Sequence, residues 1–177
     1  MNTFFKQNPN WYAVYTRSRA EKKLQALLTQ KKVECFLPLK KTASQRTDRK
    51  KIIELPLIPS YLFVRITEKE HYEVLNTQGA VCYVKFDGQP AAIPDEQINS
   101  LKQLMMTKPQ DLTVQYDNFS RGDIVQVCSG PLKGIIAEVV QIRGKDRLLL
   151  RFESLGYCVH VELTVEELTA CRDLAVC

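Results

Sequence analysis

Residue patterns typical of catalytic and metal sites are missing from this chain of 177 residues. Two histidines occur, His71 and His160, and neither lies near a cysteine in sequence. No two of the six cysteines form a CxxC pair. We therefore expect free thiols and neither a metal site nor a disulfide framework. No nucleophile motif or glycine-rich phosphate loop is present, so we expect no enzyme, catalytic residue, metal or cofactor. The cysteines are Cys35, Cys82, Cys128, Cys158, Cys171 and Cys177.

Long apolar segments are also missing. No apolar run approaches the roughly 20 residues that a membrane-spanning helix needs. The first residues, Met1 to Asn10, are polar and lack the apolar core of a signal peptide. Both absences favour a cytoplasmic protein that does not contact membranes. The composition, with 45% hydrophobic and 25% charged residues, is that of an ordinary globular protein.

Positive charge is present, but it is concentrated in the first third of the chain. Residues 1–66 hold 14 Lys and Arg against 4 Asp and Glu, whereas residues 67–118 hold 4 against 8 and residues 119–177 hold 7 against 8. A local basic field attracts polyanions and steers them to one face. Solvated basic surfaces are also common, so charge alone leaves nucleic-acid binding open.

The first part of the chain alternates between strand and helix patterns. Trp11–Tyr15 is a run of aromatic and β-branched residues that predicts a strand. Ser18–Glu21 has the S-x-x-E spacing of a capping box, which predicts the start of a helix that ends near Lys31. A polar, basic segment, Lys40–Lys51, indicates a hairpin tip or loop, and Glu68–Asn76 a short helix. The buried stripe of the first helix follows from helical spacing and comprises Ala20, Leu24, Leu27 and Leu28.

A strand expected at Tyr61–Ile66 has two different faces. The aliphatic face, which should pack on the helices, consists of Leu62, Val64 and Ile66. The other face consists of Tyr61, Phe63 and Arg65. This aromatic face is either a second buried face or an exposed docking surface, and from the pattern alone burial is the safer interpretation.

The last third is patterned as short strands separated by turns. Ile124–Val127, Ile135–Ile142, Arg147–Phe152 and Cys158–Leu163 follow one another closely, which predicts a small β-barrel over residues 119–170. Residues 108–118 have no apolar periodicity and are predicted to be a linker, and residues 171–177 a tail. The turn residues around the first of these strands are Gly122, Asp123, Gly130, Pro131 and Gly134. Their pattern resembles a KOW motif, the signature of small barrels found in RNA-binding, ribosomal and transcription proteins.

Taken in order, these segments resemble the NusG family of transcription elongation factors. The resemblance runs from about Trp11 to Leu168. Within the family the chain is most similar to the specialised RfaH and UpxY paralogues, which are antiterminators. The matching residues are Trp11–Tyr15, Leu37–Leu39, Pro56–Val64, Thr77–Gly79, Val84, Ala92–Pro94, the KOW segment and Val161–Leu163.

The resemblance implies an α+β protein without catalytic residues. A NusG-type N-terminal (NGN) domain, residues 1–107 with an antiparallel sheet flanked by helices, would bind RNA polymerase and suppress pausing or termination, for instance at surface-polysaccharide operons. An SH3-like barrel with the KOW motif would contact a ribosomal protein, Rho or nascent RNA. The residues expected to bind polymerase are Leu37, Pro38, Tyr61 and Phe63. Those expected to contact the non-template DNA strand are Arg17, Arg19, Lys22, Lys23, Thr77 and Gln78.

Two departures from the family pattern bear on partners. Leu155–Gly156–Tyr157 stands where NusG has Phe-Gly-Arg, so the missing arginine puts coupling to Rho or the ribosome in doubt. Gln78 stands where RfaH has arginine, so a different base preference is expected. The alternative function is a KOW-containing RNA-binding or ribosome-associated protein that does not act on polymerase; exposed Tyr61 and Phe63 would favour polymerase, and burial of both would favour RNA.

Overall fold

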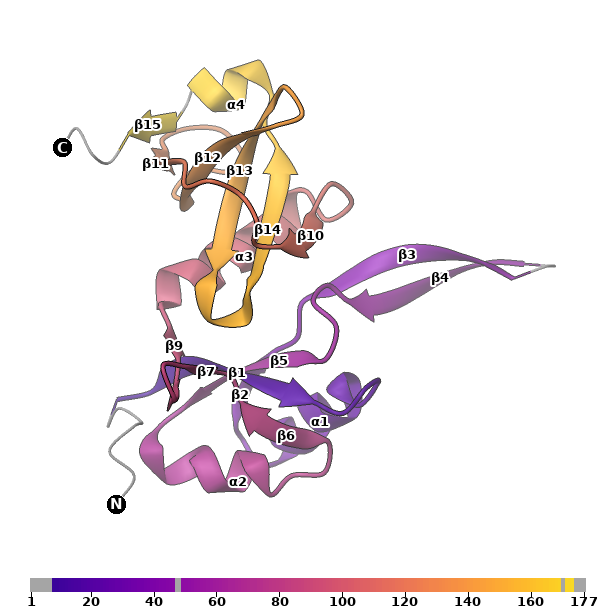
Figure 1. Cartoon of the computed structure of the whole chain (residues 1–177). Coiled ribbons are helices and arrows are strands. Elements are labelled where there is room, and N and C mark those ends of the chain that lie inside the picture. The colour runs from indigo at the N-terminus through magenta and orange to yellow at the C-terminus, as the bar shows by residue number, and fades with distance from the viewer. Residues whose placement is uncertain (1–7, 47–48, 170, 174–177) are drawn as a thin grey trace. The chain divides into compact units, whose positions relative to one another are not determined.

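The computed structural model describes residues 8–46, 49–169 and 171–173, and within these ranges the side chains of residues 44–51 and 168–173 are not considered (Figure 1). The chain folds into two compact units, residues 1–95 and 96–177, each built on an antiparallel sheet with helices. The predicted α+β class is therefore confirmed. Within the described ranges, no helix is both long and apolar enough to cross a membrane.

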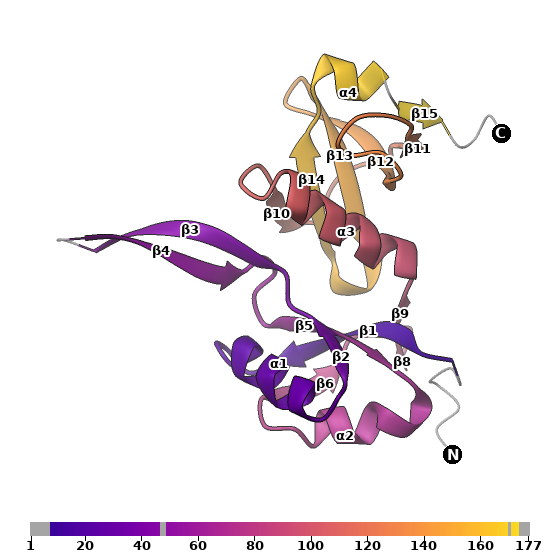
Figure 2. The same ribbon diagram turned by 180° about the vertical axis from the view of Figure 1, so that it is seen from behind.

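The N-terminal unit is an antiparallel sheet covered by helices on one face. Its strand order is β2-β5-β1-β6, and β9 also pairs with β1. Figure 1 and the reverse view in Figure 2 both show α1 and α2 on the same side of this sheet. The strands are β1 (Asn10–Thr16), β2 (Glu34–Phe36), β5 (Tyr61–Ile66), β6 (Ala80–Tyr83) and β9 (Ala92–Ile93), and the helices are α1 (Glu21–Gln30) and α2 (His71–Leu75).

The aliphatic face of β5 forms the core of this unit, as its alternation predicts. Leu62, Val64 and Ile66 are fully buried and belong to one hydrophobic cluster with Leu24 and Leu28 of α1. Burial of each such side chain stabilises the fold by about 1.5–3 kcal/mol relative to leaving it exposed.

The start of α1 differs from the predicted capping box. The helix begins at Glu21 with Ala20 as N-cap, and no side chain caps it. Glu21 is buried, and its Oε1 accepts a hydrogen bond from the backbone N–H of Ser60 at 2.8 Å. The carboxylate is thus used to hold the turn before β5. A capping box does occur before α2, where Thr67 is the N-cap and Glu70 the third residue of the 3₁₀ helix η1 (Glu68–Glu70).

Two hairpins complete the N-terminal unit. β3 (Leu39–Arg46) and β4 (Arg49–Pro56) pair along their whole length, so the predicted basic segment is a hairpin. Its tip residues, 47 and 48, lie outside the described residues. A smaller hairpin joins β7 (Lys85–Phe86) to β8 (Gln89–Pro90).

The C-terminal unit contains a six-stranded antiparallel sheet in the order β10-β14-β13-β12-β11-β15. The four predicted strands are present with ends shifted by a residue or two. The strands are β10 (Thr113–Tyr116), β11 (Asp123–Val127), β12 (Ile136–Ile142), β13 (Lys145–Phe152), β14 (Tyr157–Glu162) and β15 (Cys171–Asp173). The helices are α3 (Asp95–Thr107), η2 (Glu153–Leu155) and α4 (Val165–Thr169).

Three parts of the expected organisation differ from the structure. The expected linker, residues 108–118, contains β10, which pairs with β14. The expected tail contains β15, which pairs with β11 through Cys171–Asp173. The division between the units falls after Asp95, not after residue 107, because hydrogen bonds from Gln97, Gln103 and Lys108 attach α3 to the C-terminal unit.

A buried ion pair holds the segment that leads into the barrel. The guanidinium of Arg151 donates two hydrogen bonds to the carboxylate of Glu138, both at 2.8 Å, and also bonds Asp117 and the backbone carbonyl oxygens of Phe119 and Ser120. The Arg151 and Glu138 side chains are only 8% and 12% exposed. The hydrogen bonds from Arg151 hold the pKa of Glu138 below its ordinary value of 4.5. Removing one partner of such a pair leaves a buried charge uncompensated.

We expect this pair to make the C-terminal unit sensitive to acid. Because the pKa of folded Glu138 is depressed, its stabilisation is present above about pH 4.5 and is lost as the pH falls through the folded value. Glu138→Gln should cost about 3–5 kcal/mol at pH 7 and should flatten the decline in stability below pH 4.5. Denaturant unfolding of wild type and variant at pH 7 and at a series of pH values below 4.5, followed by far-UV circular dichroism, measures both effects. An equal acid-induced loss in the two proteins would contradict this assignment.

Candidate protein-docking and nucleic-acid surfaces

The face of the N-terminal sheet opposite α1 and α2 carries an aromatic cluster. The β1–β5 register sets Tyr15 opposite Tyr61 and Ala13 opposite Phe63, so these side chains share one face. The rings of Tyr15 and Tyr61 meet edge to face with centroids 5.5 Å apart, and Phe36 stacks on Phe63 at 6.1 Å. We call this surface the aromatic face and define it by Trp11, Tyr15, Phe36, Tyr61 and Phe63.

Exposure divides the aromatic face into a closed part and an open end. Phe63 is fully buried, Leu37 is 6% exposed and Pro38 is buried. Tyr61 is half-buried, and Tyr15 is 42% exposed. The structure therefore matches neither of the two outcomes named for this face, because Phe63 is buried and Tyr61 is only half-buried. Sequence reasoning missed Tyr15, although the alternation within Trp11–Tyr15 would have placed it beside Tyr61 once the register was known.

Basic side chains gather where β1 turns into α1. Arg17, Arg19 and Lys23 are exposed there, and so is Gln78. The loop that carries Gln78 is fastened to this turn by a hydrogen bond from the backbone N–H of Arg17 to the carbonyl oxygen of Gly79 at 2.9 Å. Gly79 adopts a φ of 105°, and a Cβ there would lie 3.3 Å from that of Ala20, so glycine suits this approach. The structure thus joins two segments more than 50 residues apart in one surface.

Two of the expected nucleic-acid residues have other roles. Thr77 is buried; its hydroxyl donates to the carbonyl oxygen of Glu73 at 2.7 Å and accepts from Nζ of Lys31 at 3.0 Å. Lys22 is exposed but lies 4.0 Å from the Glu54 carboxylate of β4. An exposed pair at that distance contributes little stability. Thr77 fixes its loop, and Lys22 lies toward the hairpin.

The KOW residues build the turns on either side of β11. The backbone N–H of Gly122 donates to Oε2 of Glu138 at 3.1 Å, and a Cβ on Gly122 would lie 2.1 Å from the carbonyl oxygen of Val139. Asp123 opens β11. After β11, Gly130 and Gly134 both adopt positive φ around Pro131, and Gly134 donates to the carbonyl oxygen of Val127 at 2.7 Å. The glycines of the KOW motif are therefore required by the backbone geometry of these two turns.

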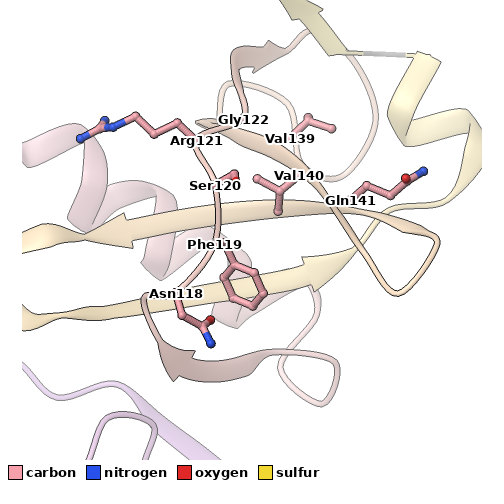
Figure 3. A pocket seen from close by; sticks show the side chains of 8 residues that line it. All are labelled: Asn118, Phe119, Ser120, Arg121, Gly122, Val139, Val140 and Gln141. Carbon is pink, nitrogen blue, oxygen red and sulfur yellow. The ribbon is translucent and has the colours of Figure 1, made fainter.

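A shallow cavity of about 360 Å³ lies beside the first KOW turn. Its lining comes from the segment before β11 and from β12, and the Arg121 side chain extends away from the others (Figure 3). Arg121 pairs instead with Glu153 at 2.5 Å. The lining residues are Asn118, Phe119, Ser120, Arg121, Gly122, Val139, Val140 and Gln141.

Four cysteines lie in the described part of the chain, and two of them are made less acidic by burial. Cys35, Cys82, Cys128 and Cys158 are free, as expected. Burial raises the pKa of the Cys35 and Cys158 thiols to about 11, so both stay protonated at neutral pH. No group of three or more potential metal ligands occurs among the described residues.

Comparison with known families agrees with this arrangement of surfaces. Residues 9–102 match the family model described as "Transcription termination factor nusG". The chain belongs to the NusG family. The match covers more than half of the 177 residues, from β1 into α3. The resemblance seen in the sequence is thereby confirmed at the level of the family.

Relatives extend the similarity to both units. The chain is 24% identical over 169 residues to the transcription termination/antitermination protein NusG of Rickettsia felis, covering 89% of this chain and 88% of the relative. It is 27% identical over 175 residues to the protein of the same name from Bacillus subtilis, covering 88% and 96%. These relatives are transcription factors, which is consistent with a protein that is not an enzyme. They are NusG proteins, so the closeness to RfaH and UpxY stays a prediction.

A solved structure supports the fold. The chain resembles the structure described as "Domain interaction in Thermotoga maritima NusG" with a TM-score of 0.52 and 22% identity, covering 94% of this chain and 98% of the other. At this identity the likeness supports the fold: an N-terminal α+β domain followed by a small β domain.

We expect Gly122→Ala to destabilise the C-terminal unit selectively. The added Cβ overlaps the carbonyl oxygen of Val139, and overpacking of this kind typically costs about 1–3 kcal/mol. Hydrogen exchange of the β12 and β13 amides should quicken at least fivefold. The single tryptophan, Trp11, lies buried in the other unit, so its fluorescence in denaturant serves as the control. Unchanged exchange in β12 and β13 would show that the position tolerates a side chain.

Proposed function

We propose that this chain is a transcription elongation factor that binds RNA polymerase through its N-terminal unit and suppresses pausing or termination. We further propose that it acts as an antiterminator of particular operons, such as surface-polysaccharide operons. The observation that carries the proposal is the open end of the aromatic face, Tyr15 and Tyr61, directly beside the exposed Arg17 on the same strand–turn segment. This arrangement offers an apolar anchor for a protein and positive charge for a nucleic acid within one unit.

Aromatic side chains with a polar tip are frequent anchors at protein interfaces. Tyr15 and Tyr61 fit that description because each packs against the other and remains accessible where β1 ends and β5 begins. We assign polymerase docking to these two tyrosines, at the open end of the face that also carries the buried Phe63. Leu37 belongs to the core cluster on the helix side of the sheet, so Leu37 and the buried Pro38 would act by holding the chain before β3. Their ring contact fixes both side chains before binding, which lowers the entropy cost of forming an interface.

The basic surface is assigned to single-stranded DNA of the elongation complex. Arg17, Arg19 and Lys23 would contact phosphates, and the exposed amide of Gln78 would lie beside the strand. Among the described residues, no carboxylate lies within ion-pair distance of these three cations. Their charge is therefore available to a polyanion without an existing pair being broken.

The alternative of an RNA-binding barrel has weaker support. In the C-terminal unit Lys108, Arg121, Lys145, Arg147 and Arg151 each pair with a carboxylate. Cations that already have partners gain less from phosphate. We propose that the barrel meets a protein partner, a ribosomal protein or Rho, through aromatic contacts. Tyr157, at the position of the missing arginine, stacks at 4.7 Å on Tyr116, which is 72% exposed.

The test of the function as a whole is co-purification with core RNA polymerase followed by transcription across a terminator. We expect the full chain to bind polymerase and to increase read-through. Binding to ribosomes or RNA without binding to polymerase would overturn the proposal in favour of the alternative.

Tyr15→Ala combined with Tyr61→Ala should weaken polymerase binding by about 30-fold or more, because truncation of an aromatic anchor costs roughly 2 kcal/mol. Tyr116→Ala, which removes an exposed tyrosine from the other unit, is the matched control. Affinity is measured by titrating labelled polymerase, and Trp11 fluorescence confirms that the unit stays folded. Phe63→Ala is unsuitable, because loss of a buried Phe costs about 3–5 kcal/mol of fold stability. Equal affinity of the double variant and the control would remove these tyrosines from the interface.

Replacing Arg17, Arg19 and Lys23 by Gln should weaken contact with single-stranded DNA and reduce its salt dependence. Each lost phosphate contact lowers the slope of log K against log salt by about 0.7. Binding to a labelled single strand is measured between about 50 and 200 mM salt. The control carries the same charge change at the exposed Lys69, Lys85 and Lys133. If both triple variants shift the slope alike, the effect reflects net charge and not this surface.

A further inference from the structure

Three separate segments of the N-terminal unit meet where β1 turns into α1. The backbone N–H of Thr16, at the end of β1, donates to the carbonyl oxygen of Ser60 at 2.9 Å. The next backbone N–H, that of Arg17, donates to the carbonyl oxygen of Gly79 at 2.9 Å. The chain that leads into Tyr61 and the loop before β6 are therefore both attached to two consecutive residues of the basic turn. We call this set of contacts the junction.

Glu21 closes the junction from the first turn of α1. Its side chain is only 5% exposed, and its Oε1 accepts the hydrogen bond from the backbone N–H of Ser60 at 2.8 Å. Ser60 is thus held on both sides, through its N–H by Glu21 and through its carbonyl oxygen by Thr16. A carboxylate is costly to bury without a hydrogen-bond donor, and the N–H of Ser60 gives Glu21 that donor.

Two residues beside Glu21 hold a backbone conformation that their side chains disfavour. Ser60 has a φ of 65° and Arg19 a φ of 60°, both in the left-handed region that residues other than glycine rarely adopt. Such conformations persist only where surrounding contacts hold them. For Ser60 the contacts are the hydrogen bonds to Glu21 and Thr16, so loss of the Glu21 carboxylate should let the segment that leads into Tyr61 relax.

We propose that Glu21 is a positioning residue that holds both binding surfaces of the N-terminal unit in place. Tyr61 follows Ser60 directly, and Arg17 follows Thr16 directly, so the same junction sets the tyrosines and the basic surface. The inference rests on the proposed function, because it takes the tyrosines to bind polymerase and the basic surface to bind DNA. Since Glu21 is buried, its loss should weaken binding of both partners although it touches neither.

Hydrogen exchange on the full chain tests the junction without either partner. Glu21→Ala removes the acceptor, Glu21→Asp keeps the charge but shortens the reach, and Glu21→Gln keeps the reach without the charge. Glu73→Ala, which removes an exposed carboxylate from α2, is the control. We expect exchange of the Ser60 and Arg17 amides to quicken about tenfold or more in the Ala and Asp variants of Glu21 and to stay near wild type in the other two. Trp11 fluorescence checks that the unit remains folded.

Binding measurements then separate positioning from charge. Removing a carboxylate near a basic surface should by charge alone strengthen binding to a polyanion. We expect instead that Glu21→Ala and Glu21→Asp weaken binding of a labelled single-stranded DNA about threefold or more, because the phosphate contacts lose their fixed geometry. Both variants should also weaken binding of core RNA polymerase. Glu21→Gln and Glu73→Ala should bind both partners at least as tightly as wild type.

The comparison of Glu21→Asp with Glu21→Gln decides the proposal, because the first keeps the charge and the second keeps the reach. Equal affinities of these two variants for both partners, or weakening toward only one partner, would overturn it. So would exchange at Ser60 that is the same in all four variants. Wild-type protein that binds neither polymerase nor DNA would refute the proposed function instead, and the exchange measurement would still decide whether Glu21 holds the junction.

Discussion

The antiparallel pairing of β1 with β5 is the constraint on which the N-terminal unit depends. Its register runs from Asn10 opposite Ile66 to Tyr15 opposite Tyr61. Because side chains alternate along a strand, a slip of one residue would turn Leu62 and Val64 out of the core and the tyrosines into it. The same pairing therefore creates the hydrophobic cluster beneath the helices and the aromatic face on the other side. Since β1 leads directly into the basic turn at Arg17, the register also fixes where positive charge stands relative to Tyr15.

The C-terminal unit depends on a different kind of interaction. A small barrel has little core, and this one adds a buried pair between Arg151 and Glu138 that also holds the backbone of Gly122. Desolvation of two charges is costly, so such a pair specifies geometry more reliably than it adds stability. Here the geometry is the approach of the Asp117–Gly122 segment to β12, where no Cβ fits at Gly122. The glycine that marks the KOW pattern and the ion pair that no motif describes are two parts of one arrangement.

Elements that are marked by a strong periodic pattern could be predicted from the sequence. Features that depend on partners distant in the chain could not. Alternation along Tyr61–Ile66 gave the correct core face, and the glycine spacing gave the barrel strands to within a residue or two. The four residues of β10 are too few to show a pattern, and they become a strand only because β14 lies beside them. Ser18 and Glu21 have the spacing of a capping box, but the N–H of Ser60, 39 residues away, binds the carboxylate. For the site, the basic turn was predictable, whereas the burial of Thr77 and Phe63 depends on tertiary contacts that no local pattern reports.

The position of α3 shows how sequence similarity and folding can divide a chain differently. The family match ends at residue 102, inside α3, so by similarity this helix continues the N-terminal domain. By its hydrogen bonds the helix belongs to the C-terminal unit, and its one residue in the first unit, Asp95, is held by Arg65. A sequence match runs along consecutive residues of the chain. The packing of a helix depends instead on which surface covers its buried face. In this chain the side chains of Gln97, Gln103 and Lys108 decide the matter, because all three donate hydrogen bonds to the C-terminal unit. The junction is therefore set by the partner of one helical face, and the expected linker, which contributes a strand to the barrel, cannot serve as a hinge while that strand is paired.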